Sequence, residues 1–203
     1  MPRRNPDLHG NVPDKSPVAL LLIDVINDLE FEGAASLLAF ALPMAERLWE
    51  LKRLAKAAGV SVIFANDNFG RWQSNFTAQV EHCLGDGVRG EPIARLLRPD
   101  EVDYFVLKPK HSAFFSTTLE LLLSYLRVES LILTGLAGNI CVLFSANDAY
   151  LRDYRLHVPR DCVASNTAEE NDAALEQMRT VLKADIRPSS EIDFAALGAR
   201  RQS

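Results

Sequence analysis

The stretch VALLLID at residues 18–24 decides the fold class of this chain, because a continuous apolar run leads directly into an aspartate. Such a run is typical of a strand buried on both faces, as in a parallel sheet. Similar short apolar runs predict further strands at residues 60–65, 104–107, 131–135, 156–159 and 184–186. Helical spacing of apolar residues predicts helices over residues 44–58, 119–126 and 140–151 and in the segment after Thr167. Thr-x-x-Glu patterns at Thr117 and Thr167 are typical of capping boxes that open two of these helices.

Strands that alternate with helices predict a single three-layer α/β domain. We expect a mainly parallel, Rossmann-like sheet of about six strands, with right-handed crossovers that place helices on both faces. The predicted domain spans residues 18–190. A proline-rich arm precedes it at residues 1–17, and a tail follows at residues 191–203.

The amino-acid composition of the chain indicates which kinds of molecule it can bind. The 203 residues include 22 Lys and Arg against 27 Asp and Glu, a net charge of −5, so we expect no nucleic-acid partner. The longest apolar runs are about six residues, far short of the roughly 20 that a membrane helix needs, and the polar start does not resemble a secretory signal. The three cysteines, Cys83, Cys141 and Cys162, are an odd, sparse set rather than a disulfide framework. The sequence therefore predicts a reduced, cytoplasmic protein with no membrane partner.

Chemically active side chains stand where three of the predicted strands end. Asp24 closes the first strand, Lys108 closes the third, and Cys141 lies just beyond the fourth, at the start of a helix. Because ligands of parallel α/β sheets bind outside the carboxyl ends of the strands, we expect these side chains to converge. A helix N-terminus and a nearby lysine favour a thiolate, and an aspartate can accept the thiol proton. The pattern predicts a nucleophilic cysteine site.

Each of these residues also has an ordinary structural interpretation. An aspartate at a strand end is often a turn or cap residue, and a lysine there is usually solvated. A cysteine in an apolar helix is usually a small buried hydrophobe. Spacing alone leaves both interpretations open.

The sequence around all three residues resembles the isochorismatase-like cysteine hydrolase family, which includes nicotinamidases and N-carbamoyl amidases. The segments that carry the resemblance are IDVIND at residues 23–28, KPKHSAF at residues 108–114 and GLAGNICV at residues 135–142. Their order and spacing agree with the family from about residue 17 to residue 187.

This resemblance implies a catalytic triad of Asp24, Lys108 and Cys141. It also implies a non-proline cis peptide bond between Leu136 and Ala137, which would aim the amides of Ala137 and Cys141 at one oxyanion. A homo-oligomer, either a dimer or a tetramer, is likewise implied.

The segment NDNF at residues 66–69 bears on metal binding. Zinc-containing nicotinamidases of the family carry Asp-x-His after the second strand, and here Asp67 is present but Phe69 stands in the place of the histidine. The chain has only four histidines, so we expect no catalytic metal.

The same segment follows the second strand and should border the site. We predict that Phe31, Asn68, Phe69 and Trp72 bind the substrate. A well-packed turn or an oligomer contact would explain the segment equally well.

The run GDGVRG at residues 85–90 matches the dinucleotide fingerprint G-x-G-x-x-G. That fingerprint binds a pyrophosphate only between a strand and a helix. Here it follows residues 76–84, which have a helical pattern, so we expect an ordinary loop.

The leading hypothesis is a cofactor-independent cysteine hydrolase that cleaves a C–N bond of a small amide or ureido compound through a thioester on Cys141. One alternative is a vinyl ether hydrolase of the isochorismatase type, which needs the acid more than the thiol. Another is a binding or assembly protein, because a fold does not determine a function.

Overall fold

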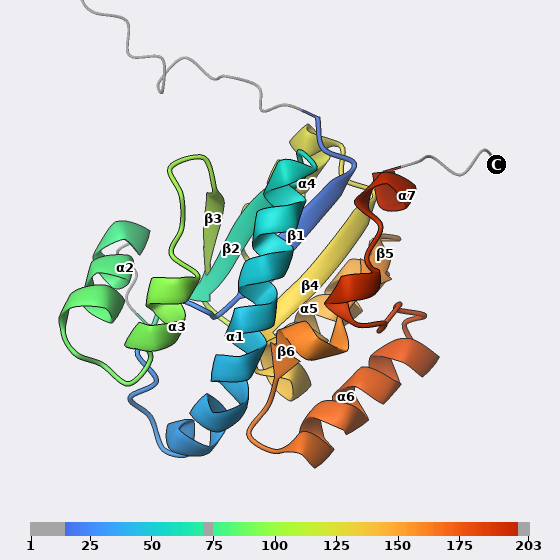
Figure 1. Cartoon of the computed structure of the whole chain (residues 1–203). Coiled ribbons are helices and arrows are strands. Elements are labelled where there is room, and N and C mark those ends of the chain that lie inside the picture. The colour runs from blue at the N-terminus through green and yellow to red at the C-terminus, as the bar shows by residue number, and fades with distance from the viewer. Residues whose placement is uncertain (1–14, 71–74, 199–203) are drawn as a thin grey trace, which may run out of the picture.

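Six parallel strands form the central sheet of the structure, a computed structural model that describes residues 15–70 and 75–198. In chain order the strands are β1 (Val18–Ile23), β2 (Ser61–Asp67), β3 (Tyr104–Lys108), β4 (Ser130–Leu136), β5 (Arg155–His157) and β6 (Val163–Ala164). Their spatial order is β3-β2-β1-β4-β5, and β6 pairs with β4 (Figure 1). The predicted parallel α/β sheet is confirmed.

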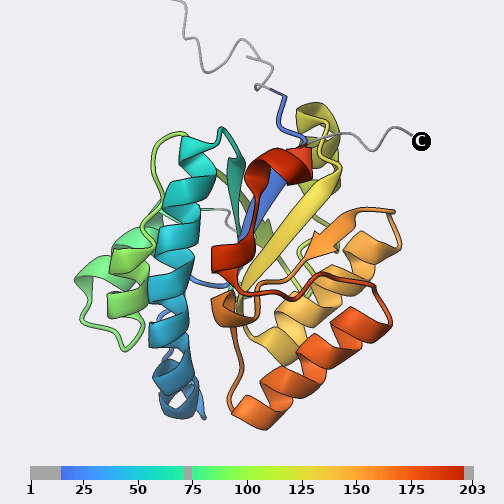
Figure 2. The same ribbon diagram turned by 45° about the vertical axis from the view of Figure 1, so that its right-hand side comes forward.

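Helices cover both faces of this sheet, as predicted. They are α1 (Ala34–Ala57), α2 (Phe76–Gly85), α3 (Glu91–Leu96), α4 (Leu119–Leu126), α5 (Leu143–Tyr150), α6 (Ala168–Thr180) and α7 (Phe194–Gly198). Figure 2 shows α1 on one side of the sheet and α5 and α6 on the other. Among the described residues, none of the helices combines the length and apolarity that crossing a membrane would require.

The alternation of side chains along β1 explains why its sequence is apolar throughout. Leu20 and Leu22 pack into the core beneath α1, whereas Leu21 and Ile23 pack into the core beneath α4, α5 and α6. All six residues of the strand are buried. A strand covered on both faces needs no polar positions.

The strand order places a topological switch point between β1 and β4. The chain runs outward from β1 through β2 to β3, then returns to add β4 on the other side of β1. Gly135 permits the close pairing, since a Cβ there would collide with the backbone of Ile23, and its φ of +107° suits glycine. The carboxyl ends of β1 and β4 therefore lie side by side at the position where doubly wound sheets bind ligands.

Helix α1 begins at Ala34, ten residues before the predicted start at residue 44. The prediction rested on the apolar spacing from Met44 onward, whereas the helix also contains the preceding ten residues, Pro43 among them. The apolar stripe continues through it, because Leu37 and Ala41 are buried on the same face as Leu48. Their burial offsets the roughly 3 kcal/mol that an interior proline costs.

Two other predicted elements are wrong in detail. The sixth strand expected at residues 184–186 is reduced to a single bridge between His157 and Asp185, and β6 supplies the last strand instead. Thr118, rather than Thr117, is the N-cap residue of α4. The Thr117 hydroxyl donates to the carbonyl of Ala113 at 2.6 Å and so fixes the preceding loop.

Further predicted features can be located in the structure. The Thr167 side chain caps α6 by accepting the Glu170 amide, as predicted. Gly85 ends α2, and residues 86–90 connect it to α3 rather than a strand to a helix, so the glycine run forms an ordinary connection between two helices. The expected arm falls outside the described residues at positions 1–14. Within the expected tail, α7 packs Phe194 and Leu197 against the core, and positions 199–203 fall outside the described residues.

Candidate active site

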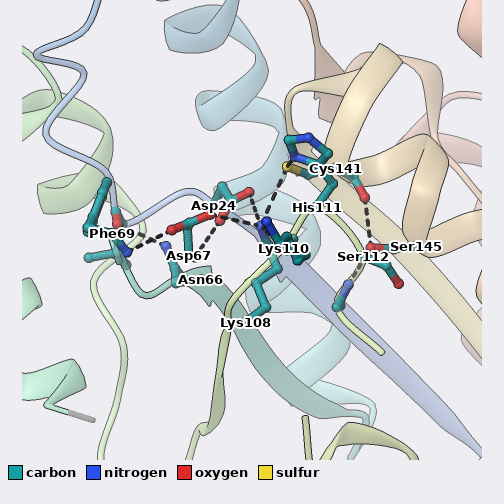
Figure 3. Close-up of polar contacts among 12 residues, drawn as sticks. Asp24, Asn66, Asp67, Phe69, Lys108, Lys110, His111, Ser112, Cys141 and Ser145 are labelled. Atoms are coloured by element: carbon teal, nitrogen blue, oxygen red, sulfur yellow. Dashed lines mark hydrogen bonds and ion pairs between the residues drawn. The ribbon is translucent and has the colours of Figure 1, made fainter. Parts of the chain in front are cut away.

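Asp24, Lys108 and Cys141 come together at the carboxyl edge of the sheet, as the sequence predicted (Figure 3). The Lys108 Nζ lies 2.8 Å from Asp24 Oδ2 and 3.5 Å from Cys141 Sγ. Asp24 and Lys108 are buried, and Cys141 is half-buried. The three side chains form one connected polar cluster.

Asp24 is fixed by its backbone as well as by its side chain. It follows β1 with a left-handed φ of 53°, a conformation that aspartate tolerates better than most residues do. Its amide donates to the carbonyl of Ala65, and its Oδ1 accepts the amide of Asp67 at 2.7 Å. The end of β2 therefore orients the carboxylate and leaves Oδ2 for Lys108.

Lys108 reaches the site from two strands away. It is the last residue of β3 and pairs in register with Asp67 of β2, so its aliphatic stem crosses the end of β2. The ammonium contacts Asp24, the carbonyl of Lys110 at 3.3 Å and Asp67 Oδ2 at 3.8 Å. Its side chain is 0% exposed, so protein groups rather than bulk water compensate its charge.

Cys141 lies in a π-helical turn, η2 (Gly138–Val142), between β4 and α5. The Val142 amide reaches back five residues to the carbonyl of Ala137 at 3.1 Å. Gly138 is buried where a Cβ would collide with Asn171 and Ser165. Single π turns inserted into helices are frequent at functional sites.

The implied cis peptide bond is wrong. No cis peptide bond occurs in the part of the chain that the structure describes, so the Leu136–Ala137 bond is trans. Ala137 instead leads into the turn with an extended backbone, φ −82° and ψ 143°. The trans form is the low-energy state of a non-proline peptide.

Two backbone amides of the η2 turn already donate hydrogen bonds within the protein. The Asn139 amide donates to Ser165 Oγ at 3.2 Å, and the Ile140 amide donates to the carbonyl of Ala137. These donors hold the turn together and are not free for a ligand. The amides of Ala137 and Cys141 stay our predicted oxyanion donors.

The electrostatic state of the thiol differs from the sequence-based expectation. Burial raises the pKa of the Cys141 thiol to about 12, the charge of Asp24 adds to the rise, and Lys108 opposes it. The expected lowering by the helix N-terminus and the lysine is therefore outweighed by burial and a carboxylate. With its pKa raised this far, Cys141 is a thiol at neutral pH, and Lys108 Nζ lies 3.5 Å from its sulfur.

The pKa values of Asp24 and Lys108, which lie beside the thiol, are also shifted. Burial raises the pKa of Asp24 above its usual range, although the charge of Lys108 and hydrogen bonds to the carboxylate oppose the rise. Burial alone would lower the pKa of Lys108, but the charges of Asp24 and Cys141 outweigh it and the pKa is raised. A carboxyl group with a raised pKa is a stronger base for a thiol, and a permanent ammonium stabilises negative charge beside it.

His111, Ser112 and Ser145 adjoin the site and were not predicted. His111 Nδ1 lies 3.8 Å from Cys141 Sγ, and Ser145 Oγ donates to the carbonyl of Cys141 at 2.7 Å. Two signals were available in the sequence. His111 and Ser112 belong to the segment that begins with Lys108, and Ser145 lies four residues after Cys141 on the same helical face.

The structure describes three of the four predicted substrate-binding residues, Phe31, Asn68 and Phe69. Phe31 and Phe69 are about half exposed, and Figure 3 shows Phe69 at the end of the cluster away from Cys141. Asn68 Oδ1 accepts the amide of Gly70, so its side chain already closes a local turn. Trp72 lies outside the described residues. Substrate binding by these four side chains stays a prediction.

The residues at the metal position of the family form local contacts. Asp67 Oδ1 accepts the amide of Phe69 at 2.7 Å, and its Oδ2 faces Lys108. Across residues 15–70 and 75–198, no three acidic, histidine or cysteine side chains are grouped in a way that could hold a metal ion. Asp67 therefore serves as a partner of the lysine in this arrangement.

The other two cysteines lie in the core. Cys83 and Cys162 are 0% exposed, and burial raises the pKa of each thiol to about 12. Cys141 differs from them because a carboxylate, an ammonium and an imidazole surround its sulfur. The arrangement can transfer a thiol proton to a buried carboxylate beside a fixed positive charge.

Known proteins resemble this chain over most of its length. The family model of the isochorismatase domain matches residues 18–186. The isochorismatase family protein YaaI of Bacillus subtilis is 41% identical over 88% of this chain and 97% of its own length. The maleamate amidohydrolase of Pseudomonas putida is 27% identical over 77% of this chain and 76% of its own length.

Solved structures show the same architecture. The N-carbamoylsarcosine amidase of Thermoplasma acidophilum superimposes with a TM-score of 0.69 at 25% identity, covering 87% of this chain and 98% of that one. The pyrazinamidase/nicotinamidase of Streptococcus mutans superimposes with a TM-score of 0.64 at 24% identity, covering 83% and 99%.

Proposed function

The chain belongs to the isochorismatase family and is a hydrolase, and from this premise we propose that it cleaves a C–N bond of a small amide or ureido compound. The observation that carries the proposal is the position of Cys141 Sγ, 3.5 Å from the Lys108 Nζ that is itself paired with Asp24 Oδ2 at 2.8 Å. Relatives named for amide hydrolysis, such as the maleamate amidohydrolase, support it.

In the acylation step, Cys141 is the nucleophile and Asp24 is the base. The thiol proton passes to the Asp24 carboxylate as sulfur attacks the substrate carbonyl carbon. The amides of Ala137 and Cys141 stabilise the resulting oxyanion. When the C–N bond breaks, the proton on Asp24 passes to the leaving nitrogen, and a thioester remains on the enzyme.

In the deacylation step, the same carboxylate works in reverse order. Asp24 takes a proton from water as the water oxygen attacks the thioester carbon. The C–S bond then breaks, the carboxylic or carbamic acid leaves, and the proton returns to sulfur. Lys108 stays protonated throughout, orients Asp24 and stabilises negative charge on sulfur. The cycle requires no metal or organic cofactor.

The test combines substrate screening with one substitution. We expect the protein to release ammonia or an amine from at least one member of a panel containing maleamate, ureidoacrylate, N-carbamoylsarcosine, nicotinamide and pyrazinamide. The Cys141→Ala variant should lose turnover while its urea midpoint stays within error of the parent. A Cys141→Ala variant that hydrolyses the same amide at the parent rate would overturn the covalent mechanism.

The alternative functions give different outcomes in the same assays. Release of pyruvate from isochorismate, retained in Cys141→Ala, would identify a vinyl ether hydrolase. A chain that turns over neither class of substrate, and whose cysteines all react equally slowly with iodoacetamide, would be a binding or assembly protein. We expect Cys141 to label first, because Cys83 and Cys162 are fully buried.

We also propose a homo-oligomer in a reducing compartment, the cytoplasm. Large apolar side chains are exposed on the outer helices, among them Leu121 and Tyr125 of α4 and Leu151 just after α5. Exposed apolar surface of this kind is often covered by a second copy. Light scattering after size exclusion should give twice or four times the chain mass of 22.5 kDa.

A further inference from the structure

Two serine hydroxyls join the loop that follows β3 to the η2 turn that carries Cys141 and to the adjoining helix α5. Ser145 Oγ donates to the carbonyl of Cys141 at 2.7 Å and accepts the amide of Ala113 at 2.9 Å. Ser112 Oγ donates to Asp148 Oδ2 at 2.5 Å. We call this pair of links, Ser112 to Asp148 and Ala113 through Ser145 to Cys141, the hydroxyl clamp (Figure 3 shows its two serines).

The Ser145 link lies in the interior, whereas the Ser112 link ends on the half-buried Asp148, which is itself anchored. Ser145 and Ala113 are 0% exposed, and Ser112 is 5% exposed. Asp148 is held in turn by Arg152, whose Nη1 donates to Asp148 Oδ1 at 3.2 Å. The contacts therefore form a fixed connection between the loop and the helix rather than a surface hydrogen bond that water can replace.

The loop held by the clamp carries two of the three groups that contact the nucleophile. Lys108 begins it, and the carbonyl of Lys110 accepts the Lys108 ammonium at 3.3 Å. His111 immediately precedes Ser112 and contacts Cys141 Sγ at 3.8 Å. On the other side, Cys141 itself accepts the Ser145 hydroxyl through its backbone carbonyl. The hydroxyl clamp thus connects the backbone of Cys141 to the loop whose Lys108 and His111 side chains contact the sulfur.

We propose that Ser145, together with Ser112, is a positioning residue that sets the separation between Cys141 Sγ and the groups on the loop after β3. The inference rests on the proposed function, because it assumes that Cys141 is the nucleophile. Without the Ser145 hydroxyl, the buried Ala113 amide loses its acceptor and the loop is free to move away from α5. A displacement of about 1 Å between reacting groups can cost about 100-fold in rate.

The test measures acyl transfer to Cys141 with p-nitrophenyl acetate, which requires no knowledge of the natural substrate. Stopped-flow release of p-nitrophenolate gives the acetylation rate constant, and peptide mapping identifies the acetylated cysteine. We expect Ser145→Ala to lower this rate constant by about 100-fold. Ser145→Thr keeps the hydroxyl and should recover at least a tenth of the parent rate, because threonine in a helix can also bond to the carbonyl four residues back.

Thr134→Val is the matched control. The Thr134 hydroxyl is equally buried and also donates to a backbone carbonyl, that of Leu21 at 2.6 Å, but it lies within β4. We expect Thr134→Val to lower the urea midpoint about as much as Ser145→Ala while its acetylation rate stays within about 3-fold of the parent. Equal slowing of both variants, or a parent rate in Ser145→Ala, would overturn the positioning role.

Two further variants complete the design. If Ser145→Ala does not fold, Ser112→Ala removes the other link without altering the η2 turn or α5. It should then slow acetylation at least 10-fold, and a parent rate would overturn the proposal. Cys141→Ala separates this proposal from the proposed function. A burst that survives in Cys141→Ala contradicts the nucleophile itself, whereas a burst lost there but normal in the serine variants contradicts only the clamp.

Discussion

The buried pair of Asp24 and Lys108 offers the most quantitative test of the site. The two charges are 2.8 Å apart, and their side chains are 9% and 0% exposed. Breaking a buried ion pair by removing one partner costs about 3–5 kcal/mol, because the remaining charge is left without compensation. We therefore expect Lys108→Met to lose about 3–5 kcal/mol of unfolding free energy at pH 7. Asp24→Asn should lose less, because the raised pKa of Asp24 means that its own ionisation opposes folding.

The double variant should be more stable than either single variant. With both charges gone, no buried ion remains, and the side-chain carbonyl introduced by Asp24→Asn can still accept the Asp67 amide that Asp24 Oδ1 accepts in the parent. Replacing a buried ion pair with uncharged groups of similar size is often neutral in stability. A coupling free energy of about 3 kcal/mol or more should result.

Urea unfolding followed by circular dichroism measures all four proteins of this cycle. Single-variant losses that simply add in the double variant, within about 0.5 kcal/mol, would refute the view of the pair as one compensated unit. The pH dependence of Asp24→Asn gives a second check. Without its carboxylate, Lys108 can relieve the cost of burial by losing its proton, so the deficit of this variant should shrink as the pH rises from 7 towards 9.

Four further predictions concern pH, packing and capping. Because hydrolysis needs the ionised form of Asp24, whose pKa is raised above 3.8, the acid limb of the pH profile of kcat/KM should lie above that value, and a limb below it would contradict the assignment. Gly138→Ala should abolish hydrolysis and lower the free energy of unfolding in urea by about 1–3 kcal/mol, because the new Cβ collides with Asn171. Normal activity of this variant would show that the η2 turn can move. Burial lowers the pKa of His157 below 6.5, so the unfolded chain binds more protons and the free energy of unfolding falls as the pH falls below 6.5. His157→Gln should reduce the difference between the unfolding free energies measured in urea at pH 7.5 and pH 5.5. An unchanged difference would exclude His157 as its source. Thr167→Ala removes the cap of α6 and should cost about 1 kcal/mol in urea unfolding without affecting hydrolysis, and a loss of activity would reveal an unexpected link to the site.

The raised pKa values also determine how the site itself affects stability. For Asp24, the native state holds its proton more tightly than the unfolded chain does, so its contribution to stability falls as the pH rises above 3.8. For Lys108, the raised pKa means that the favourable contribution is complete below 10.5 and is lost as the pH rises through the folded value. Ionised Asp24 therefore lowers the stability of the protein at neutral pH, but the same raised pKa makes its carboxylate a stronger base.

The strands that position the site were predictable because their signal is local. The apolar run before Asp24 and the one before Gly135 need no information beyond neighbouring residues, since a strand buried on both faces has no polar positions. The placement of Asp24, Lys108 and Cys141 at strand ends followed from these assignments. Local patterns failed at residues 34–43, which belong to α1 although the predicted helix began at residue 44, and at residues 184–186, where a single bridge replaces the expected strand.

The sequence by itself determined the parallel α/β class and the identity of the three residues at the carboxyl edge, because hydrophobic periodicity and chain order are written along the chain. Only the tertiary structure decided how those residues interact. The strand order carries Lys108 across β2 to Asp24, and the fold brings His111 and Ser145 to the nucleophile from separate elements. Burial beside a carboxylate then makes Cys141 a protonated thiol rather than the expected thiolate, because desolvation depends on what surrounds a group in space and not on its neighbours in the sequence.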